Sequence, residues 1–291
     1  MKIFRNILPS NRCAGILVLQ TDFGNKDSAV AEMKGVALSV DDKLTIIDNT
    51  HLIEPFNIWE GAYRLYQSIK TFSQNTVFVS VIDPGVGTDR KSIVVRTQDN
   101  HYIVTQDNGT ITFVDKEIGI VEAREIDETK HRLKGSEQSA TFHGRDVYVY
   151  VGAKLASRKI SFKDVGKKID IQTLKRLAHE YPKFENGVLS GSIPALDVRF
   201  GNVWTNIKRG MLEEIDFKRG DRYDVFITNG KTNISLDNVI YAKTFGDVAV
   251  GEPVLYINSL DCLSIAINIG DFAETYGVEY GLNWKIEIKK S

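Results

Sequence analysis

Three aspartates stand where an enzyme could use a carboxylate: Asp22, Asp83 and Asp107. Each follows an apolar run that predicts a strand, and each precedes a turn that contains glycine. Open α/β sheets hold their ligands beyond the carboxyl ends of such strands. One interpretation is a metal site, because carboxylate oxygens suit Mg²⁺ or Mn²⁺. The other is structural, since aspartate routinely forms turns and caps helices.

The stretch around Asp83 reads VFVSVIDPGVGTDRKSIVV, over residues 77–95. A buried-type strand ends at Asp83 in a Pro/Gly turn, where glycine allows unusual dihedral angles or close approach of a ligand. Arg90 lies seven residues after Asp83, so the loop can bring the two side chains together. They could act on a substrate, or form a structural ion pair that closes a strand–loop–strand corner.

A histidine, His143, stands just ahead of a predicted helix in the segment TFHGRD, close to Arg145 and Asp146. Histidine is the side chain best suited to proton transfer near neutral pH. A single histidine is nevertheless more often an ordinary surface or core residue, so His143 needs partners before it can be assigned a function.

The second half of the chain has its own polar and aromatic cluster, DVRFGNVWTN at residues 197–206. An aromatic face with an amide edge can hold a purine by stacking and hydrogen bonds. The alternative is a strand in which Phe200 and Trp204 are core residues and Asn202 fills a turn. A further polar pair, Asn258 and Ser259, follows a predicted strand.

The elements that must position these residues fall into two groups. In the first half, strands are predicted at residues 15–20, 44–48, 77–82, 92–95, 102–105 and 118–126, with helices at 28–40, 58–69 and 147–157. The alternation of strand and helix implies a mostly parallel sheet with right-handed crossovers. Residues 127–139 are polar and are predicted to form a surface loop.

A Lys-rich stretch at residues 162–184 marks the predicted domain boundary. Beyond it come short strands with turn signals, predicted at residues 188–195, 222–227, 233–235, 239–244, 254–258, 262–267 and 284–288. The sequence therefore predicts an α/β domain over residues 1–180, followed by a smaller C-terminal β-barrel domain over residues 181–291.

Composition excludes several classes of function. The chain of 291 residues is 42% hydrophobic and 26% charged, with a net charge of −1, which is typical of a globular protein with a full core. It lacks the dense Lys/Arg stripe of a nucleic-acid binder and an apolar run near the ~20 residues that span a bilayer. Cys13 and Cys262 show neither metal-site nor disulfide spacing, and the N-terminus makes a poor signal peptide, so we expect a cytoplasmic protein.

Seven short motifs together resemble one family: TDFG at residues 21–24, MKG at 33–35, DPGVGTDR at 83–90, QDNG at 106–109, TFHGRD at 141–146, FGNVWTNI at 200–207 and NS at 258–259. Each is weak alone, but their order across the chain is specific. They resemble the S-adenosyl-L-methionine (SAM) hydroxide adenosyltransferases, or SAM hydrolases, which are homologous to the fluorinating and chlorinating SAM enzymes. The resemblance extends from Gln20 to about Ile288.

This resemblance implies a seven-stranded α/β domain, a β-barrel domain and a homotrimer, with SAM between the N-terminal domain of one subunit and the C-terminal domain of its neighbour. It also implies a reaction in which water displaces methionine from C5′ of SAM, giving adenosine and L-methionine. SAM is then the substrate, and neither a cofactor nor a metal is expected.

The family's catalytic triad falls on Asp83, Arg90 and His143. Its substrate-binding positions fall on Asp22 for the ribose, Asp197 for the methionine ammonium, Ser259 near the methionine carboxylate, Phe200, Asn202 and Phe245 for adenine, and Phe56, where the halogenases carry a stacking Trp.

The chain also differs from its halogenating relatives. They have Tyr at the position of Asp83, Ser at the position of Gly144, and an extra loop after the Arg90 region, so the resemblance is to the water-using branch. Near the methionine end, Leu260 replaces an Arg of the halogenases and Asp261 replaces a common family Gly. These two changes bear on recognition of the methionine carboxylate.

Three alternatives to a SAM hydrolase stay open from the sequence. A non-catalytic SAM- or adenosine-binding protein would use the same ligand residues without turnover. A metal-dependent phosphohydrolase would use Asp22, Asp83 and Asp107 as ligands. A SAM-dependent halogenase would bind a halide ion in place of water.

Overall fold

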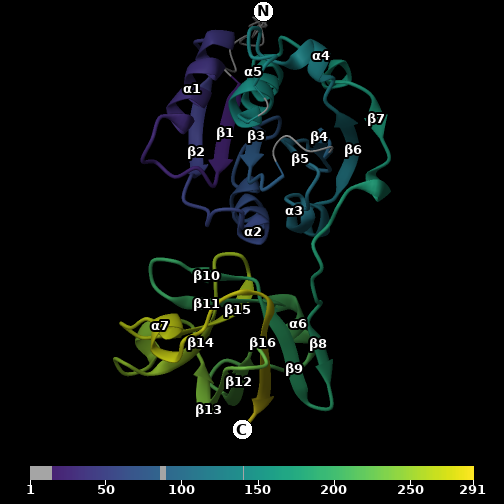
Figure 1. Ribbon diagram of the computed structural model, residues 1–291. Helices are drawn as coiled ribbons and strands as arrows, with labels where there is room; N and C mark the ends of the chain where they lie inside the picture. The colour runs from purple at the N-terminus through teal and green to yellow at the C-terminus, as the bar shows by residue number, and fades with distance from the viewer. Residues whose placement is uncertain (1–14, 86–89, 140) are drawn as a thin grey trace, which may run out of the picture. The chain divides into compact units, whose positions relative to one another are not determined.

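The structure is a computed structural model that describes residues 15–85, 90–139 and 141–291. The N-terminal segment with Cys13, and residues 86–89 of the predicted turn after Asp83, lie outside the described residues. The described chain up to Leu177 forms one compact unit and Ala178–Ser291 forms a second (Figure 1). The predicted domain boundary after residue 180 stays a prediction.

The first unit contains a seven-stranded sheet with the order β2-β1-β3-β5-β4-β6-β7. Its strands are β1 (Ile16–Thr21), β2 (Thr45–Thr50), β3 (Val77–Val81), β4 (Ser92–Thr97), β5 (Tyr102–Gln106), β6 (Ile120–Glu125) and β7 (Lys168–Ile169). Neighbours in the run β2-β1-β3-β5 pair in parallel, as the alternation of strands and helices predicted. The sheet as a whole is mixed, because β4, β6 and β7 join by antiparallel pairing.

Helices cover both faces of this sheet. On one face, α1 (Ala29–Val40) and α5 (Val149–Ala156) share a core with Leu17 and Leu19 of β1. Successive side chains of a strand alternate between faces, so Gln20 points to the opposite face. There its amide donates to Gly61 O of α2 (Ile58–Ile69) at 2.8 Å. The short helix α3 (Thr112–Glu117) packs on α2 through aromatic edge contacts.

Parallel pairing brings the predicted carboxylates to one edge of the sheet. Asp22 directly follows β1, Asp83 is two residues after the end of β3 and Asp107 directly follows β5, and these three strands run in the same direction. Strand β4 runs the other way, so it starts at that edge, two residues after Arg90. Because β3 ends and β4 starts at the same edge of the sheet, Asp83 and Arg90 lie at that edge together.

The prediction of a plain surface loop at residues 127–139 is wrong, because this segment contains helix α4 (Glu128–His131). His131 is buried: its Nε2 lies 2.8 Å from Asp164 O and its Nδ1 lies 3.1 Å from Lys154 Nζ. A helix of one turn held by polar contacts has no apolar periodicity, so the sequence pattern did not reveal it. The helix predicted at residues 147–157 is α-helical over Val149–Ala156, and a π-helical turn, Gly144–Tyr148, precedes this part.

The second unit is a nine-stranded, mostly antiparallel sheet with the order β10-β11-β15-β14-β13-β12-β16-β9-β8. Its strands are β8 (Lys183–Glu185), β9 (Val188–Ile193), β10 (Ala195–Asp197), β11 (Asn202–Lys208), β12 (Arg222–Thr228), β13 (Asn233–Tyr241), β14 (Pro253–Ile257), β15 (Cys262–Ile267) and β16 (Gly281–Lys290). Two short helices, α6 (Arg209–Glu214) and α7 (Phe272–Tyr276), complete the unit. Closure of this sheet into a barrel stays a prediction.

The strands predicted separately at residues 233–235 and 239–244 form the single strand β13. Asn238 within it has a positive φ of 57°, and the pairing with β12 shifts register between Tyr223 and Val225. An irregularity of this kind bends a strand without ending it. The polar residues around it are also typical of a turn, which is why the sequence predicted two strands.

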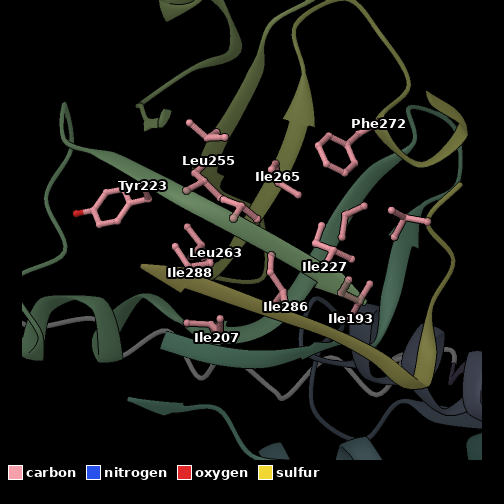
Figure 2. Packing of buried hydrophobic residues seen from close by; sticks show 14 of the residues in the cluster. Ile193, Ile207, Tyr223, Ile227, Leu255, Leu263, Ile265, Phe272, Ile286 and Ile288 are labelled. Carbon is pink, nitrogen blue, oxygen red and sulfur yellow. The ribbon is translucent and has the colours of Figure 1, made fainter. Parts of the chain in front are cut away.

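An aliphatic core fills the second unit. Figure 2 shows Leu255, Leu263 and Ile265 from β14 and β15 directed toward Ile286 and Ile288 of β16. All five side chains are at most 1% exposed. The alternation of buried and exposed residues along β16 is the pattern of a strand with one face on a core. This packing fixes the ends of β10, β11, β14 and β15, where the predicted ligand residues of this unit lie.

No helix in the described part of the chain is long and apolar enough to cross a membrane.

Candidate active site

The centre of the first unit's site is the pair formed by Asp83 and Arg90. Arg90 Nε donates to Asp83 Oδ1 at 2.5 Å, and Arg90 Nη2 donates to Asp83 Oδ2. Both side chains are less than 10% exposed. A two-pronged contact between a guanidinium and a carboxylate fixes the orientation of both planes and is stronger than a single hydrogen bond. The predicted association of these residues is therefore present, with the carboxylate held in one orientation.

The QDNG motif supports this pair from the neighbouring strand. The side-chain amides of Gln106 and Asn108 both donate to the carbonyl oxygen of Ile82, the Asn108 contact at 2.8 Å. Ile82 directly precedes Asp83, so these bonds fix the point at which β3 leaves the sheet. Asn108 Oδ1 in turn accepts from Thr110 N at 3.1 Å.

His143 is buried beside the same pair. Burial lowers the pKa of its imidazole, and the positive charges of Arg132 and Arg90 act in the same direction. The rings of His143 and Tyr148 lie 6.4 Å apart, and the hydroxyl of Tyr148 lies 3.3 Å from Ser92 Oγ. Ser92 is two residues after Arg90, so His143 lies near the start of β4, where Arg90 also lies. His143 Nε2 lies 3.1 Å from Arg132 Nη2.

Sequence reasoning missed the residues that hold His143. Glu128 Oε2 accepts from Arg132 Nη2 at 2.6 Å, and Glu128 Oε1 accepts from Ser92 Oγ at 2.7 Å. Ser92 Oγ also lies 3.3 Å from the hydroxyl of Tyr148, whose pKa burial raises. Glu128 and Arg132 are four residues apart, which places two such side chains together on one side of a helix. This four-residue spacing was the sequence signal for the Glu128–Arg132 pair, but it lies in a segment that the polar composition predicts to be a loop.

Asp22 lies at the end of β1 and accepts a hydrogen bond from Phe56 N at 2.8 Å. Burial raises the pKa of Asp22, and the Phe56 N–H partly opposes that shift. Phe56 has a positive φ of 69°, and its side chain is 67% exposed. The structure thus places the two predicted residues together, with the backbone of residue 56 on the carboxylate and its ring facing outward.

A second polar chain, which the sequence did not reveal, fixes the turn that carries Asp22. Thr21 Oγ1 lies 2.8 Å from His51 Nδ1, and His51 Nε2 lies 3.1 Å from Asp48 Oδ1. Thr21 Oγ1 also accepts from Phe23 N at 3.2 Å. His51 O accepts from Gly24 N at 2.7 Å, so His51 holds this turn at two points. Burial lowers the pKa of His51, and the Asp48 carboxylate partly opposes that shift.

The second unit contains a pocket of about 940 Å³ that gathers its predicted ligand residues. Asp197, Phe200, Asn202, Phe245 and Ser259 all line it. They come from three segments that are distant in sequence, at the ends of β10, β11 and β14 and in the turn after β13. A cavity of this size with mainly apolar walls and few polar groups is typical of a small-molecule site.

Aromatic side chains give this pocket its walls. Phe200 is 64% exposed, so the alternative in which it is a core residue is wrong, whereas Trp204 is buried, as that alternative expected. The rings of Phe245 and Tyr256 lie 4.7 Å apart in an edge contact. Burial raises the pKa of Tyr256 to about 12, so its hydroxyl keeps its proton at neutral pH.

Gly201 allows the tight turn between Asp197 and Asn202. It has a φ of 64°, and Gly201 N donates to Asp197 O at 2.8 Å. A Cβ at this position would lie 1.8 Å from Asp271 Oδ1. Only glycine can therefore occupy position 201 of this turn without strain or a clash.

The turn after β14 is organised by Asn258. Its Oδ1 accepts from Leu260 N at 2.9 Å and from Cys262 N at 3.1 Å, which leaves Ser259 exposed at the turn. Asp261 has a positive φ of 60°, the conformation in which glycine is unstrained. Its Oδ1 lies 2.9 Å from Arg209 Nε. The replacement of the family Gly thus keeps the backbone of the turn and adds an ion pair.

The three aspartates of the metal-site interpretation have separate partners. Asp83 is engaged by Arg90, Asp22 by Phe56 N, and Asp107 Oδ1 accepts from Lys175 N at 2.8 Å. Within residues 15–85, 90–139 and 141–291 there is no group of three or more His, Cys, Asp or Glu side chains that could hold a metal ion. The geometry of these carboxylates therefore does not favour a three-aspartate site.

Comparison with known proteins adds an independent finding. The SAM hydroxide adenosyltransferase N-terminal domain matches residues 17–166, and the C-terminal domain of the same family matches residues 191–285. The chain is 37% identical over 234 residues to (R)-S-adenosyl-L-methionine hydrolase of Methanocaldococcus jannaschii, covering 78% of each chain. It is 30% identical over 296 residues to a fluorinase of an Actinoplanes species, covering 92% of this chain and 95% of that protein.

Among solved structures, an uncharacterized conserved protein from Thermotoga maritima is similar over 94% of this chain and 100% of its own, with a TM-score of 0.84 and 35% identity.

The buried histidines predict how stability depends on pH. Burial lowers the pKa of His51, His101 and His143 in the folded protein. The unfolded chain, with histidine pKa values near ~6.5, then binds more protons than the folded chain as the pH falls below that value. We therefore expect the midpoint temperature of thermal unfolding to decrease as the pH is lowered from 8 to 5.5. Most carboxylates titrate below this range, so they should contribute little to the decrease. His101→Gln should reduce this slope, and a midpoint that stays constant over the range would contradict the prediction.

Proposed function

This chain belongs to the SAM hydroxide adenosyltransferase family, and we propose that it hydrolyses SAM to adenosine and L-methionine by attack of water at C5′. The observation that carries this proposal is the buried Asp83–Arg90 pair with His143 beside it at the carboxyl edge of the sheet. An aspartate can orient a water molecule and receive its proton, a histidine can form a hydrogen bond with that water, and an arginine can hold the aspartate in place.

The reaction needs little beyond correct positioning. The oxygen of water forms a bond to C5′ as the C5′–S bond breaks, and the bonding electrons go to sulfur. The cationic sulfonium thereby becomes the neutral thioether of methionine. The attacking water must lie in line with the breaking bond, and such alignment alone can lower a barrier greatly. One proton leaves the water as the new C–O bond forms.

Asp83 is the group that we assign to this water. Arg90 uses one lone pair of each carboxylate oxygen, and Gly85 N donates to Oδ1 at 3.3 Å, so Oδ2 keeps a lone pair for a hydrogen bond from water. Asp83 can therefore orient the water and accept its proton, while Arg90 prevents the carboxylate from rotating. The negative charge also lies near a cationic substrate, which favours binding, and it would repel a halide ion. This argues for water as the nucleophile.

The remaining predicted residues are proposed to hold SAM. Asp22 would accept hydrogen bonds from the ribose hydroxyls, and Asp197 would pair with the methionine ammonium. The other pocket residues of the second unit would hold the adenine and the methionine carboxylate: Phe200, Asn202, Phe245 and Ser259. Their common presence around one pocket of suitable size supports this assignment.

We propose that the reaction needs no metal ion and no cofactor, because a sulfonium is already a good leaving group and carries the charge that a Lewis acid would otherwise supply. Turnover that is unchanged by a chelator would agree with this.

We further propose a homotrimer with SAM bound at the subunit interfaces. Each unit carries only part of the ligand residues, and each exposes large apolar side chains near them. Leu52 and Phe56 in the first unit, and Val198 and Ile269 in the second, are between 67% and 83% exposed. Contact with another subunit would remove such groups from water. Sedimentation equilibrium should give the mass of three chains, and the mass of one chain would contradict this assembly.

The activity itself can be tested by chromatography of a SAM incubation, with and without EDTA. We expect adenosine and methionine in equal amounts. Asp83→Asn keeps the shape of the side chain and removes its charge, so turnover should fall by about 10²–10⁴-fold, the usual contribution of a positioned acid or base. Asp115→Asn is the matched control, because Asp115 forms a similar ion pair with Arg176 at 2.6 Å outside the site. Unchanged SAM with wild-type protein would refute the hydrolase, and full activity of Asp83→Asn would refute the role of Asp83.

A second variant separates binding from catalysis. Asp22→Ala removes the carboxylate that we assign to the ribose, at a cost typical of hydrogen bonds to a charged group, which corresponds to a rise in KM of about 10–100-fold. The turnover number should fall much less. Initial rates over a range of SAM concentrations measure both constants. Asp27→Ala, at an exposed acid in the same loop, should change neither, and a large loss of kcat at unchanged KM in Asp22→Ala would contradict the assignment.

A further inference from the structure

We propose that Arg132, held by Glu128, is a positioning residue that keeps His143 neutral with its proton on Nδ1, so that His143 acts as a hydrogen-bond donor to the attacking water. This inference rests on the proposed hydrolysis of SAM, and it assigns functions to two residues outside the triad.

The first step concerns Nε2 of His143. It lies 3.1 Å from Arg132 Nη2. A guanidinium has only donors and stays protonated at any pH of interest, so Nε2 must be the acceptor. A neutral imidazole that accepts at one nitrogen carries its proton on the other. The contact with Arg132 therefore selects the tautomer with hydrogen on Nδ1.

The second step concerns how firmly Arg132 is held. Its Nη2 donates to Glu128 Oε2 at 2.6 Å, and its Nη1 donates to Ser139 O at 3.2 Å. Glu128 is fixed in turn by Ser92 Oγ at 2.7 Å. Ser92 begins β4, two residues after Arg90. The hydrogen bonds that set the tautomer of His143 thus begin at Ser92, next to the segment that positions Arg90.

The third step concerns Nδ1 of His143. It is buried and has no hydrogen-bond partner among the residues that the structure describes. A buried N–H without a partner is costly, so such a group usually serves a ligand or an ordered water. Hydrogen bonds through Arg132 and Glu128 join His143 to Ser92, two residues after Arg90, and we assign its N–H to the water that Asp83 orients. The oxygen of that water could accept from Nδ1, donate to Asp83 and direct its remaining lone pair at C5′.

The fourth step concerns charge. The charged groups that act on His143 are Glu128, Arg132, Arg90 and Asp146. Each has a partner of opposite charge, because Glu128 pairs with Arg132, Arg90 with Asp83, and Asp146 with Arg145. Burial then decides the outcome and lowers the pKa of His143. A neutral ring adds no positive charge beside a sulfonium substrate. A protonated ring would repel both Arg132 and the substrate.

The experiment is nuclear magnetic resonance of the full chain labelled with ¹⁵N-histidine, without SAM, with His143→Gln to assign the signal. Wild-type protein should show the neutral Nδ1–H tautomer at neutral pH, and should protonate at a lower pH than an exposed histidine, because burial lowers the pKa of His143. In Arg132→Met, Glu128 Oε2, 3.7 Å from Nε2, becomes the nearest charge and favours a proton there. We expect the pKa of His143 and the acidic limb of the kcat profile to rise by about one pH unit. Arg132→Lys keeps a donor and should restore the wild-type profile in part.

Arg124→Met is the matched control, because Arg124 is similarly buried and pairs with Glu122 at 2.6 Å. It should leave the tautomer and the pH profile unchanged. An Nε2–H tautomer in wild-type protein, or an unchanged His143 signal in Arg132→Met, would overturn the inference. If Arg132→Met does not fold, the wild-type tautomer decides the matter alone. A protein that shows the Nδ1–H tautomer but does not hydrolyse SAM would refute the proposed function and leave the tautomer assignment standing.

Discussion

The two-pronged contact between Asp83 and Arg90 is the interaction on which the first unit's site depends. It exists because β4 is antiparallel to β5 and so starts where β3 ends. A wholly parallel sheet would have carried the chain through a crossover to the far edge before the next strand began. The change of strand direction at β4 thus serves the site, because it returns a cation to the carboxylate within seven residues.

Around this pair the site is built from neutral or paired groups. Arg90 is balanced by Asp83, and Arg132 is balanced by Glu128. Burial keeps His143 neutral, in a place where a third cation would be unfavourable. Isolated buried charges are costly, and mutual pairing is the usual way in which proteins tolerate them. The arrangement leaves the carboxylate of Asp83 rigid while a lone pair of its Oδ2 stays available.

Sequence reasoning predicted those features that depend on short-range patterns. The alternation of apolar runs and helical periodicity gave the parallel core of the first sheet, and the motif order gave the family. The pattern of short strands and turns also predicted the all-β second unit. It predicted two strands in place of β13, because bulges and turns use the same polar residues. The pocket residues were found only through the resemblance, since Phe200 and Ser259 are 59 positions apart and composition does not show that they meet.

The residues that hold His143 and Asp22 in place could not be predicted from the sequence, for a physical reason. Glu128 and Arg132 lie in a polar segment without apolar periodicity, and their importance comes from contacts with Ser92 and His143. The chain formed by Thr21, His51 and Asp48 likewise joins the ends of two strands through side chains that look ordinary in isolation. Such networks are specified by three-dimensional proximity, which a single sequence does not record.

The backbone at Phe56 has a consequence for how this site can change over evolutionary time. The residue holds Asp22 through its N–H, while its ring faces outward. Every amino acid except proline offers the same N–H, so the anchoring of Asp22 does not depend on a particular side chain. The φ of 69° at position 56 disfavours β-branched residues, but the other side chains can vary with the ligand and adjust what the site accepts while Asp22 stays in place.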